Sequence, residues 1–490
     1  MTLHEYVGEF NRQDIEYYPT EIPNAAAEAW LSEEIPKLTC DDKTLEKTYY
    51  YRWWVYRKHL HHTPEGYMIT EFLPKVPWSG RYNVINAAAG HHIAEGRWLK
   101  NGGMYLYDYA NLFLTSPEEG QKYSCWLIYA LHQLKGRTGE IRIADFPAKA
   151  AAYLADWERV HGTETGLFWS RDGRDAMEFS ISGTRNGRPV PGLRPTLNSY
   201  MCADYRALYE LSAEEGHPRE EYLARSEDIR RRMEDILFRD GFYKAIHPEN
   251  ENYAAARTLP TENVPRELIG FIPWYFDIPG AERDGLFDLL GAPHAFYARE
   301  GLTTAEQSDP RFLFPADHEC LWNGYVWPFA TSQTLTALLR AIRRTPATRE
   351  RYTELFYKLL RQYAAQHYLE EDGVRRMWID EVGAPDHHEW TSRTILKNAG
   401  WQPGKGGLER GKDYNHSTYA DILLSALTGV DVCGEEVTFA PVIPADMRRY
   451  IVDDLYIRGA RYRVEYDRDG AETGASGFSV YKEGKLCFHA

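Results

Sequence analysis

Two segments of the chain place a carboxylate among aromatic and apolar residues, where it could act as an acid or a base. In the first, Glu178 lies between Met177 and Phe179, and an apolar setting raises the pKa of a carboxyl towards neutrality. In the second, Glu381 lies in Met377–Trp390, a stretch that holds four carboxylates, two histidines and two tryptophans. Cleavage of a glycosidic bond requires a protonated carboxyl and a second carboxylate. We therefore predict Glu178 as a general acid and Glu381 as its partner.

Both segments allow other interpretations. Glu178 also fits a surface or helix-capping carboxylate. The second segment could bind a metal, because Asp386, His387, His388 and Glu389 are all possible ligands. Adjacent histidines point in different directions, however, and the sequence has no spaced HExxH pattern. We predict no metal and no cofactor.

A third segment, Asp317–Gln333, contains Trp322 and Trp327 on either side of a glycine turn. Here the two rings could stack on the face of a sugar and exclude water. They would be equally ordinary as core aromatics. Pro328 fits the first turn of a helix, so the segment is expected to end where a helix begins.

Helices must position these segments, because apolar residues recur with helical spacing through the middle of the chain. The pattern predicts paired helices that dominate from about 40 to 430. Two connections between them are long, 161–197 and 367–416, and they contain the two carboxylates. Long aromatic loops in a compact domain are usually functional. The expected helices lie near 121–135, 145–160, 198–214, 229–237, 335–342, 356–363 and 417–428.

After about residue 436 the pattern changes to short alternating runs separated by turn signals, which predicts a small β-rich appendage. Tyr450–Ile457 and Ala460–Tyr466 are the clearest strands, and turns are expected at Asp467–Gly470 and Lys482–Lys485.

Composition narrows the partners. A formal net charge of -15 disfavours nucleic acid, whose phosphates attract clustered Lys and Arg. Fourteen Trp and 35 Tyr exceed the usual needs of a core, which favours an aromatic cleft and a carbohydrate partner. The six cysteines lack metal-like spacing and are expected to be free thiols. No run suits a signal peptide or membrane insertion, so we expect a cytoplasmic protein, or a secreted or periplasmic one whose signal peptide was removed.

The same residues carry a family resemblance. Trp322–Pro328 resembles the W-x-G-P-V-W-P segment of family-63 glycosidases and their bacterial and mannosylglycerate-hydrolase-like relatives. Ala176–Ser180 resembles their G-M-D-x-S segment, whose carboxylate is the general acid. Glu381–Pro385 resembles their E-x-x-x-P segment, whose Glu is the general base, and Tyr414–Asp421 resembles a later Y-x-H-S helix start. The resemblance runs from about 40 to 430 in matching order.

This resemblance implies an all-α fold, an (α/α)6 toroid of the six-hairpin glycosidases with a small C-terminal β appendage. The implied organisation is an N-terminal extension at 1–40 packing on the barrel, a catalytic barrel at 41–432 and the appendage at 433–490. Two departures stand out. Glu178 replaces the usual Asp, which moves the proton donor by about 1.5 Å, and Arg174-Asp175 replaces a Glu-Ser pair.

The resulting prediction is an exo-acting, inverting glycosidase. Stacking or hydroxyl contacts with the sugar are expected from side chains in several segments: Trp53, Tyr82, Arg194, Asn198, Trp322, Trp327 and His416.

Other functions remain open on the same barrel. A polysaccharide lyase or an epimerase could use His91, His92 and Tyr82 as bases. A phosphorylase would not need Glu381. A catalytically inactive carbohydrate-binding barrel would keep the tryptophans without needing two carboxylates in register.

Overall fold

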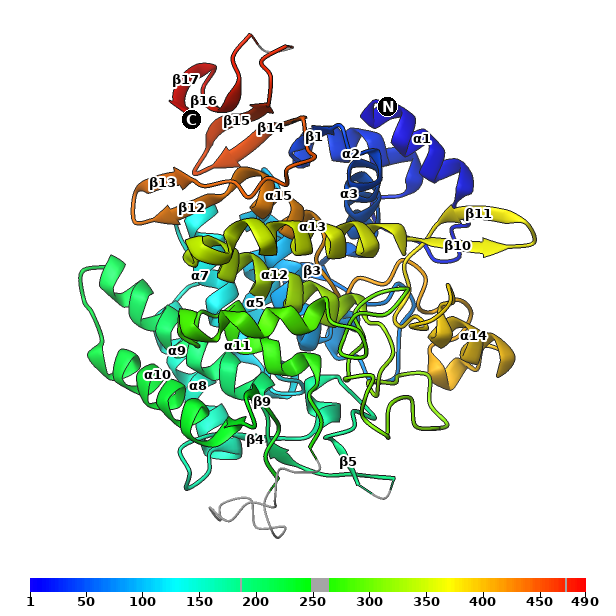
Figure 1. The fold of residues 1–490 in the computed structure, drawn as a ribbon, viewed down its shortest axis with the longest axis vertical. Helices are drawn as coiled ribbons and strands as arrows, with labels where there is room; N and C mark the ends of the chain where they lie inside the picture. Colours follow the sequence, from blue (N-terminus) through cyan, green and yellow to red (C-terminus); the bar gives the residue numbers. More distant parts are fainter. Residues whose placement is uncertain (186, 248–263, 472–473) are drawn as a thin grey trace.

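A computed structural model of the 490-residue chain describes residues 1–185, 187–247, 264–471 and 474–490, and helices dominate it (Figure 1). The helices expected from the apolar spacing are present, and the segment near 229–237 forms the end of α10 and a following π turn, Met233–Leu237. The α-helices are α1 (Leu3–Gln13), α2 (Ala27–Glu34), α3 (Lys43–Tyr56), α4 (Ala89–Gly96), α5 (Gly102–Thr115), α6 (Pro117–Gly120), α7 (Leu127–Thr138), α8 (Phe146–His161), α9 (Pro195–Glu214), α10 (Glu220–Arg232), α11 (Ile272–Tyr275), α12 (Pro328–Arg344), α13 (Arg349–Ala365), α14 (Thr391–Asn398) and α15 (Ala420–Thr428).

Neighbouring helices pack in pairs. α9 packs on α7 and α10, and α12 packs on α11 and α13, while α13 also contacts α3. Proline begins α9 and α12, where the missing amide hydrogen costs nothing and the fixed φ suits a helix. Both helices therefore start sharply, directly after the loops that carry the candidate site.

The tail folds as expected into an antiparallel sheet, but with one strand from the far end of the chain. β1 (Lys37–Cys40) pairs along β14 (Arg449–Ile457), and the order continues through β15 (Ala460–Asp467), β16 (Gly477–Lys482) and β17 (Lys485–His489). Both chain termini lie at the end of the molecule that carries this sheet (Figure 1). One continuous cluster of buried apolar side chains extends from Tyr6 through the helices to Val480.

Short hairpins interrupt the helical part. They pair β2 (Leu60–Thr63) with β3 (Gly66–Ile69), β4 (Trp169–Ser170) with β7 (Gly192–Leu193), β5 (Thr184–Arg185) with β6 (Arg188–Pro189), β8 (Phe238–Arg239) with β9 (Phe242–Tyr243), β10 (Tyr368–Glu371) with β11 (Val374–Met377), and β12 (Val430–Cys433) with β13 (Glu436–Phe439).

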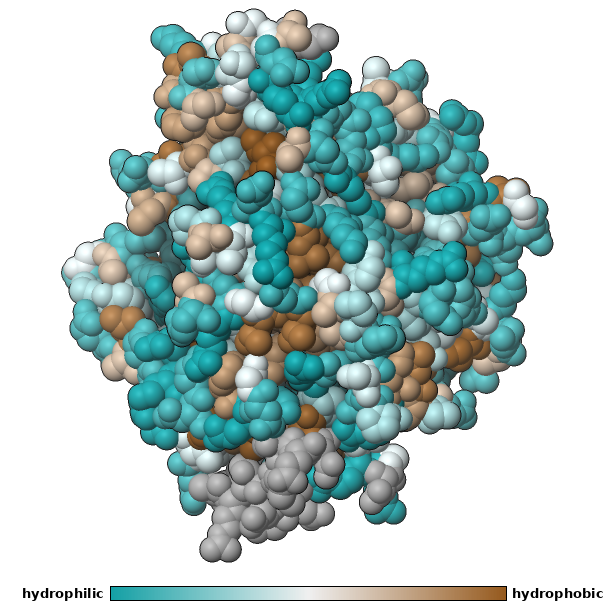
Figure 2. All heavy atoms as spheres, in the orientation of Figure 1, coloured by the Kyte–Doolittle hydropathy of each residue, from teal (hydrophilic) through white to brown (hydrophobic). Residues whose placement is uncertain are grey.

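Mostly hydrophilic residues cover the face shown in Figure 2, with separate, small apolar patches. No helix within the described ranges is long and apolar enough to span a bilayer. The six cysteines are free thiols, of which Cys40, Cys125 and Cys202 are buried.

Candidate active site

Glu178 lies in the loop between α8 and α9, on a tight and strained turn. Ala176 and Phe179 have φ values of 55° and 60°, a conformation that costs residues other than glycine about 1–3 kcal/mol each. The Met177 amide donates to the carbonyl of Asp172 (2.9 Å) and helps to hold the turn. The carboxyl is thus presented on a backbone of fixed shape.

A buried ion pair secures the same loop. Arg194 Nε donates to Asp175 Oδ2 (2.7 Å), and another of its nitrogens donates to Ser182 (3.1 Å). One turn into α9, the side chain of Asn198 both accepts from the Phe168 amide (2.8 Å) and donates to the Phe168 carbonyl (2.9 Å). Both predicted hydroxyl contacts, Arg194 and Asn198, are fully buried and are used inside the protein to shape the loop that holds Glu178.

Glu381 lies in the long loop between α13 and α15 and is 3% exposed. The guanidinium of Arg410 donates to Glu381 Oε2 and, through its other terminal nitrogen, to Glu319 Oε1 (3.0 Å). The ring of Trp78 lies against this guanidinium, with 4.7 Å between the guanidinium carbon and the ring centroid. A cation therefore holds Glu381 in position and favours its ionised form.

The segment with the two tryptophans connects both loops. The Trp322 amide donates to the carbonyl of Glu178 (3.1 Å), while Val326 and Gly383 exchange two backbone hydrogen bonds of 2.9 Å. The rings of Trp322 and Trp327 stack on each other with centroids 4.5 Å apart, and both are buried. In this structure the pair braces the two carboxylate loops, and its burial does not fit the predicted role of a sugar platform.

The thiol of Cys320 lies next to the two carboxyls. Its Sγ donates to Glu178 Oε2 (3.3 Å). Burial, followed by the charges of Glu178 and Glu381, raises the pKa of this thiol well above its usual value, so it stays protonated and can donate. Burial also raises the pKa of Glu178 to about 7. It raises the pKa of Glu381 to about 8, although the charge of Arg410 opposes the rise. Both carboxyls therefore titrate near neutrality.

A third buried carboxylate, Glu71, lies close by. Tyr414 donates to Glu71 Oε1 (2.9 Å), and His416 Nδ1 is 3.0 Å from the same oxygen. Burial raises the pKa of Tyr123, and the charges of Glu178 and Glu71 add to this rise. His416, a predicted contact residue, is thus buried in a polar network beside the carboxyl pair.

Two other predicted sugar contacts lie elsewhere. Trp53 is in the middle of α3, 0% exposed, with its ring packed edge-on against Tyr56 (5.6 Å between centroids). No sugar can stack on a ring with no exposed face, so the structure contradicts the platform role of Trp53. Tyr82 is partly exposed in a short helical turn, Arg81–Asn83, and its hydroxyl donates to Glu65 (3.1 Å).

Other aromatic rings have the exposure that Trp53 lacks. Trp169, Tyr123 and Phe179 are partly exposed and line a cavity of about 550 Å³ together with Glu178. These rings, rather than the buried tryptophans, can contact a ligand without rearrangement of the core.

Arg410, Glu319, Cys320 and Glu71 were missed as site residues in the sequence analysis. Cys320 and Glu319 lie within the third aromatic segment, so proximity to its motif was an available signal. Glu71 follows an apolar run, Tyr67–Thr70, where an isolated acid is unusual. Arg410 has no comparable signal, because its neighbours are ordinary loop residues and its partners are distant in sequence.

The possible metal ligands in the second loop do not converge. His387 pairs with Asp386 (2.8 Å) at the surface, whereas the ring of His388 stacks on Tyr368 with centroids 3.6 Å apart. Within the residues that the structure describes, no three His, Cys, Asp or Glu side chains are grouped as a metal would require.

Replacing Arg410 by Gln is expected to move the pH optimum of turnover upwards. An adjacent cation lowers a carboxyl pKa by about 1–3 units, so its loss raises the pKa of Glu381 by that amount. Because the optimum lies midway between the pKa values of an acid and a base, it should rise by about half as much. The measurement is kcat/KM against pH.

Lys405→Gln is the matched control, since Lys405 contacts Glu319 (3.0 Å) and not Glu381. Arg410→Lys keeps the charge and should keep most of the optimum. An unchanged optimum in a folded Arg410→Gln protein would show that this cation does not tune Glu381. Thermal unfolding reports the fold, because breaking a buried pair costs about 3–5 kcal/mol.

Comparison with known proteins agrees with this geometry. The model of the mannosylglycerate hydrolase MGH1-like glycoside hydrolase domain matches residues 81–417, which is more than half of the chain. No curated protein matches the chain in sequence.

Several solved structures are similar. One, named "Sialidase", has a TM-score of 0.87 and 29% identity, with 100% of this chain and 44% of that chain covered. This chain therefore spans less than half of that protein. A GH78 family rhamnosidase of Bacillus sp. GL1 has a TM-score of 0.52 and 14% identity, covering 88% of this chain and 40% of the other. The GH63 mannosylglycerate hydrolase from Thermus thermophilus, in complex with Tris and D-glycerate, has a TM-score of 0.49 and 12% identity, covering 77% and 98%.

Proposed function

Since the chain belongs to the mannosylglycerate hydrolase MGH1-like glycoside hydrolases and is a glycosidase, we propose that it is an exo-acting, inverting enzyme with Glu178 as acid and Glu381 as base. The observation that carries this assignment is the unequal environment of the two carboxyls. Glu381 contacts the guanidinium of Arg410, whereas Glu178 accepts a hydrogen bond from the neutral thiol of Cys320.

In the proposed reaction, Glu178 donates its proton to the glycosidic oxygen as the bond from the anomeric carbon to that oxygen breaks. Glu381 accepts a proton from a water that attacks the anomeric carbon from the opposite face. Inversion requires a separation of about 6.5–9.5 Å between the two carboxyls, enough for this water. Burial of both groups strengthens their electrostatic effect on the charge that develops at the sugar.

A neutral sugar suits the position of the reacting ring. Arg410 is already shared by Glu381 and Glu319, so it has little capacity left for a substrate carboxylate. The similarity to a structure named "Sialidase" favours an acidic sugar as the second candidate, and Lys122, Arg171 and Arg174 line the cavity beside Glu178. A bounded cavity of about 550 Å³, as opposed to a long groove, supports action at a chain end.

The proposal includes the architecture. We propose that the paired helices of 41–432 form the (α/α)6 toroid of this family, with 1–40 and 433–490 packed against it. The sharp starts of α9 and α12 beside the two loops support this organisation.

A panel of nitrophenyl glycosides and reducing oligosaccharides, including a sialoside, tests substrate and mechanism together. We expect hydrolysis of one sugar class, with the first product anomer opposite to that of the substrate by NMR. Retention of the anomer would contradict the inverting assignment. New absorbance near 235 nm from an unsaturated product would point to a lyase, and phosphate-dependent cleavage to a phosphorylase. Calorimetric binding of sugar without turnover would identify an inactive binding barrel.

A further inference from the structure

A second pocket, of about 550 Å³, lies at the other end of the helices from the carboxylates. α12 begins directly after Trp327 and ends at Arg344, which lines this pocket. Its 17 residues span about 25 Å at 1.5 Å per residue. The pocket is therefore separate from the candidate active site.

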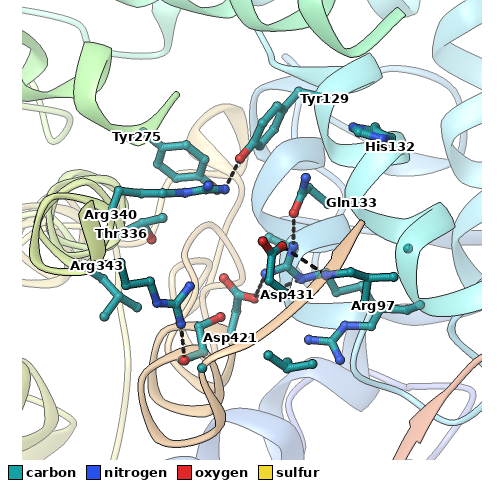
Figure 3. Close-up of a pocket in the computed structure, with 18 of the residues that line it drawn as sticks. Arg97, Tyr129, His132, Gln133, Tyr275, Thr336, Arg340, Arg343, Asp421 and Asp431 are labelled. Atoms are coloured by element: carbon teal, nitrogen blue, oxygen red, sulfur yellow. Dashed lines mark hydrogen bonds and ion pairs between the residues drawn. The ribbon is translucent and has the colours of Figure 1, made fainter. Parts of the chain in front are cut away.

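Arginines dominate the lining of this pocket, in a chain whose net charge is -15. In the described part of the chain, seven arginines line it and four carboxylates accompany them. Figure 3 shows Arg340 and Arg343 extending from α12 towards the space that Arg97 faces from the opposite side. Such a concentration of guanidinium groups is typical of sites for phosphate and other oxyanions.

Some of these arginines are already neutralised. Arg97 pairs with Asp421 (2.7 Å), and Arg340 pairs with Asp277 (3.1 Å). Arg344 pairs with Asp284. These pairs account for part of the charge and need no ligand.

Arg137 and Arg343 differ from the others. Arg137 is 8% exposed and lies over the ring of Trp98 (3.9 Å to the centroid), and its Nη1 is buried without a hydrogen-bond partner among the described residues. Arg343 donates to the Ser425 carbonyl, while its buried Nε likewise lacks a partner in the described ranges. A buried guanidinium without an acceptor is costly, and an oxyanion would satisfy it.

Helix ends explain only some of these contacts. α7 and α15 present their C-termini here, and their partial negative charge attracts cations. Arg343 uses one nitrogen for this purpose at Ser425, and Arg458 donates to Gly136 O (3.3 Å). The free nitrogens of Arg137 and Arg343 remain after these contacts. Asp431, which also lines the pocket, supplies a single carboxylate against both.

We propose that this pocket binds a small tetrahedral oxyanion of the phosphate class through Arg137 and Arg343. The ligand is either free phosphate or the phosphate group of a sugar ester, which present the same oxygens to the two guanidinium groups. The site does not depend on the reaction proposed for the carboxylates.

Isothermal titration calorimetry with the full chain tests this site, using inorganic phosphate, glucose 6-phosphate and chloride at equal ionic strength. We expect saturable binding of at least one phosphate compound and none of chloride. Arg343→Gln should weaken the binding by at least tenfold, because each charge-assisted contact contributes about 1.5–3 kcal/mol. Tighter binding of the ester identifies a phosphorylated sugar as the ligand, and equal binding identifies free phosphate.

Arg230→Gln is the matched control, since Arg230 is exposed on α10, pairs with Glu227 and lies outside the pocket. Arg137→Gln is a second variant, whose fold must be checked by thermal unfolding because Arg137 packs on Trp98. Phosphate compounds that bind no better than chloride would overturn the proposal. Unchanged affinity in Arg343→Gln would overturn it as well.

Discussion

Replacing Glu381 by Gln is expected to lower kcat by about 10²–10⁴-fold, the usual contribution of a general base. Gln has nearly the same shape but cannot accept the proton of the attacking water. It can still accept a hydrogen bond from Arg410, so the loop should keep its conformation. The loss should appear in kcat for every substrate, whatever its leaving group, because water attack precedes release of any product in an inverting reaction.

Glu371→Gln is a suitable control for this variant. Glu371 is also a loop carboxylate paired with cations, Arg393 and Lys397, but it lies on β10 away from the thiol of Cys320. It should retain turnover. Wild-type turnover in Glu381→Gln would remove Glu381 from the mechanism, and far-ultraviolet circular dichroism would show whether any loss came from unfolding.

The positions of the two carboxylates could be predicted from sequence because they depend on local patterns. Apolar spacing located α8, α9, α13 and α15, and therefore the two long loops between them. The aromatic density of those loops then indicated Glu178 and Glu381. Proline at the start of α12 identified the end of the third segment in the same way.

Contacts between distant segments could not be predicted in this way. Aromatic residues are used both in cores and in clefts, and spacing does not distinguish the two, so Trp53 and Trp322 were expected at the ligand although both are buried. The guanidinium of Arg410 reaches Glu381 and Glu319 across 29 and 91 residues. Such a pairing depends on the packing of loops, for which a single sequence contains no periodic signal. The addition of β1 to the C-terminal sheet is a similar long-range contact.

Glu178→Gln should separate the roles of the two carboxyls through the leaving group of the substrate. A sugar or alkyl leaving group needs a proton as its bond breaks, so its hydrolysis should slow by about 10²–10⁴-fold. A dinitrophenyl leaving group departs as a stable anion, and its hydrolysis should slow by no more than about tenfold. The measurement is kcat/KM for both substrates of the same sugar.

The partners of Glu178 give this prediction its physical basis. Its only close side-chain donor in the described structure is the Cys320 thiol, and burial raises its pKa to about 7, so the protonated form persists to neutral pH. Above that pH, hydrolysis of the poor leaving group should decline in the wild type, and Glu178→Gln should abolish this decline. Glu178→Asp is the matched variant, because it restores the family's residue and withdraws the carboxyl by about 1.5 Å. It should lie between wild type and Gln. Equal losses on both leaving groups in Glu178→Gln would instead assign this carboxyl to the attack of water, and the pair would have to exchange roles.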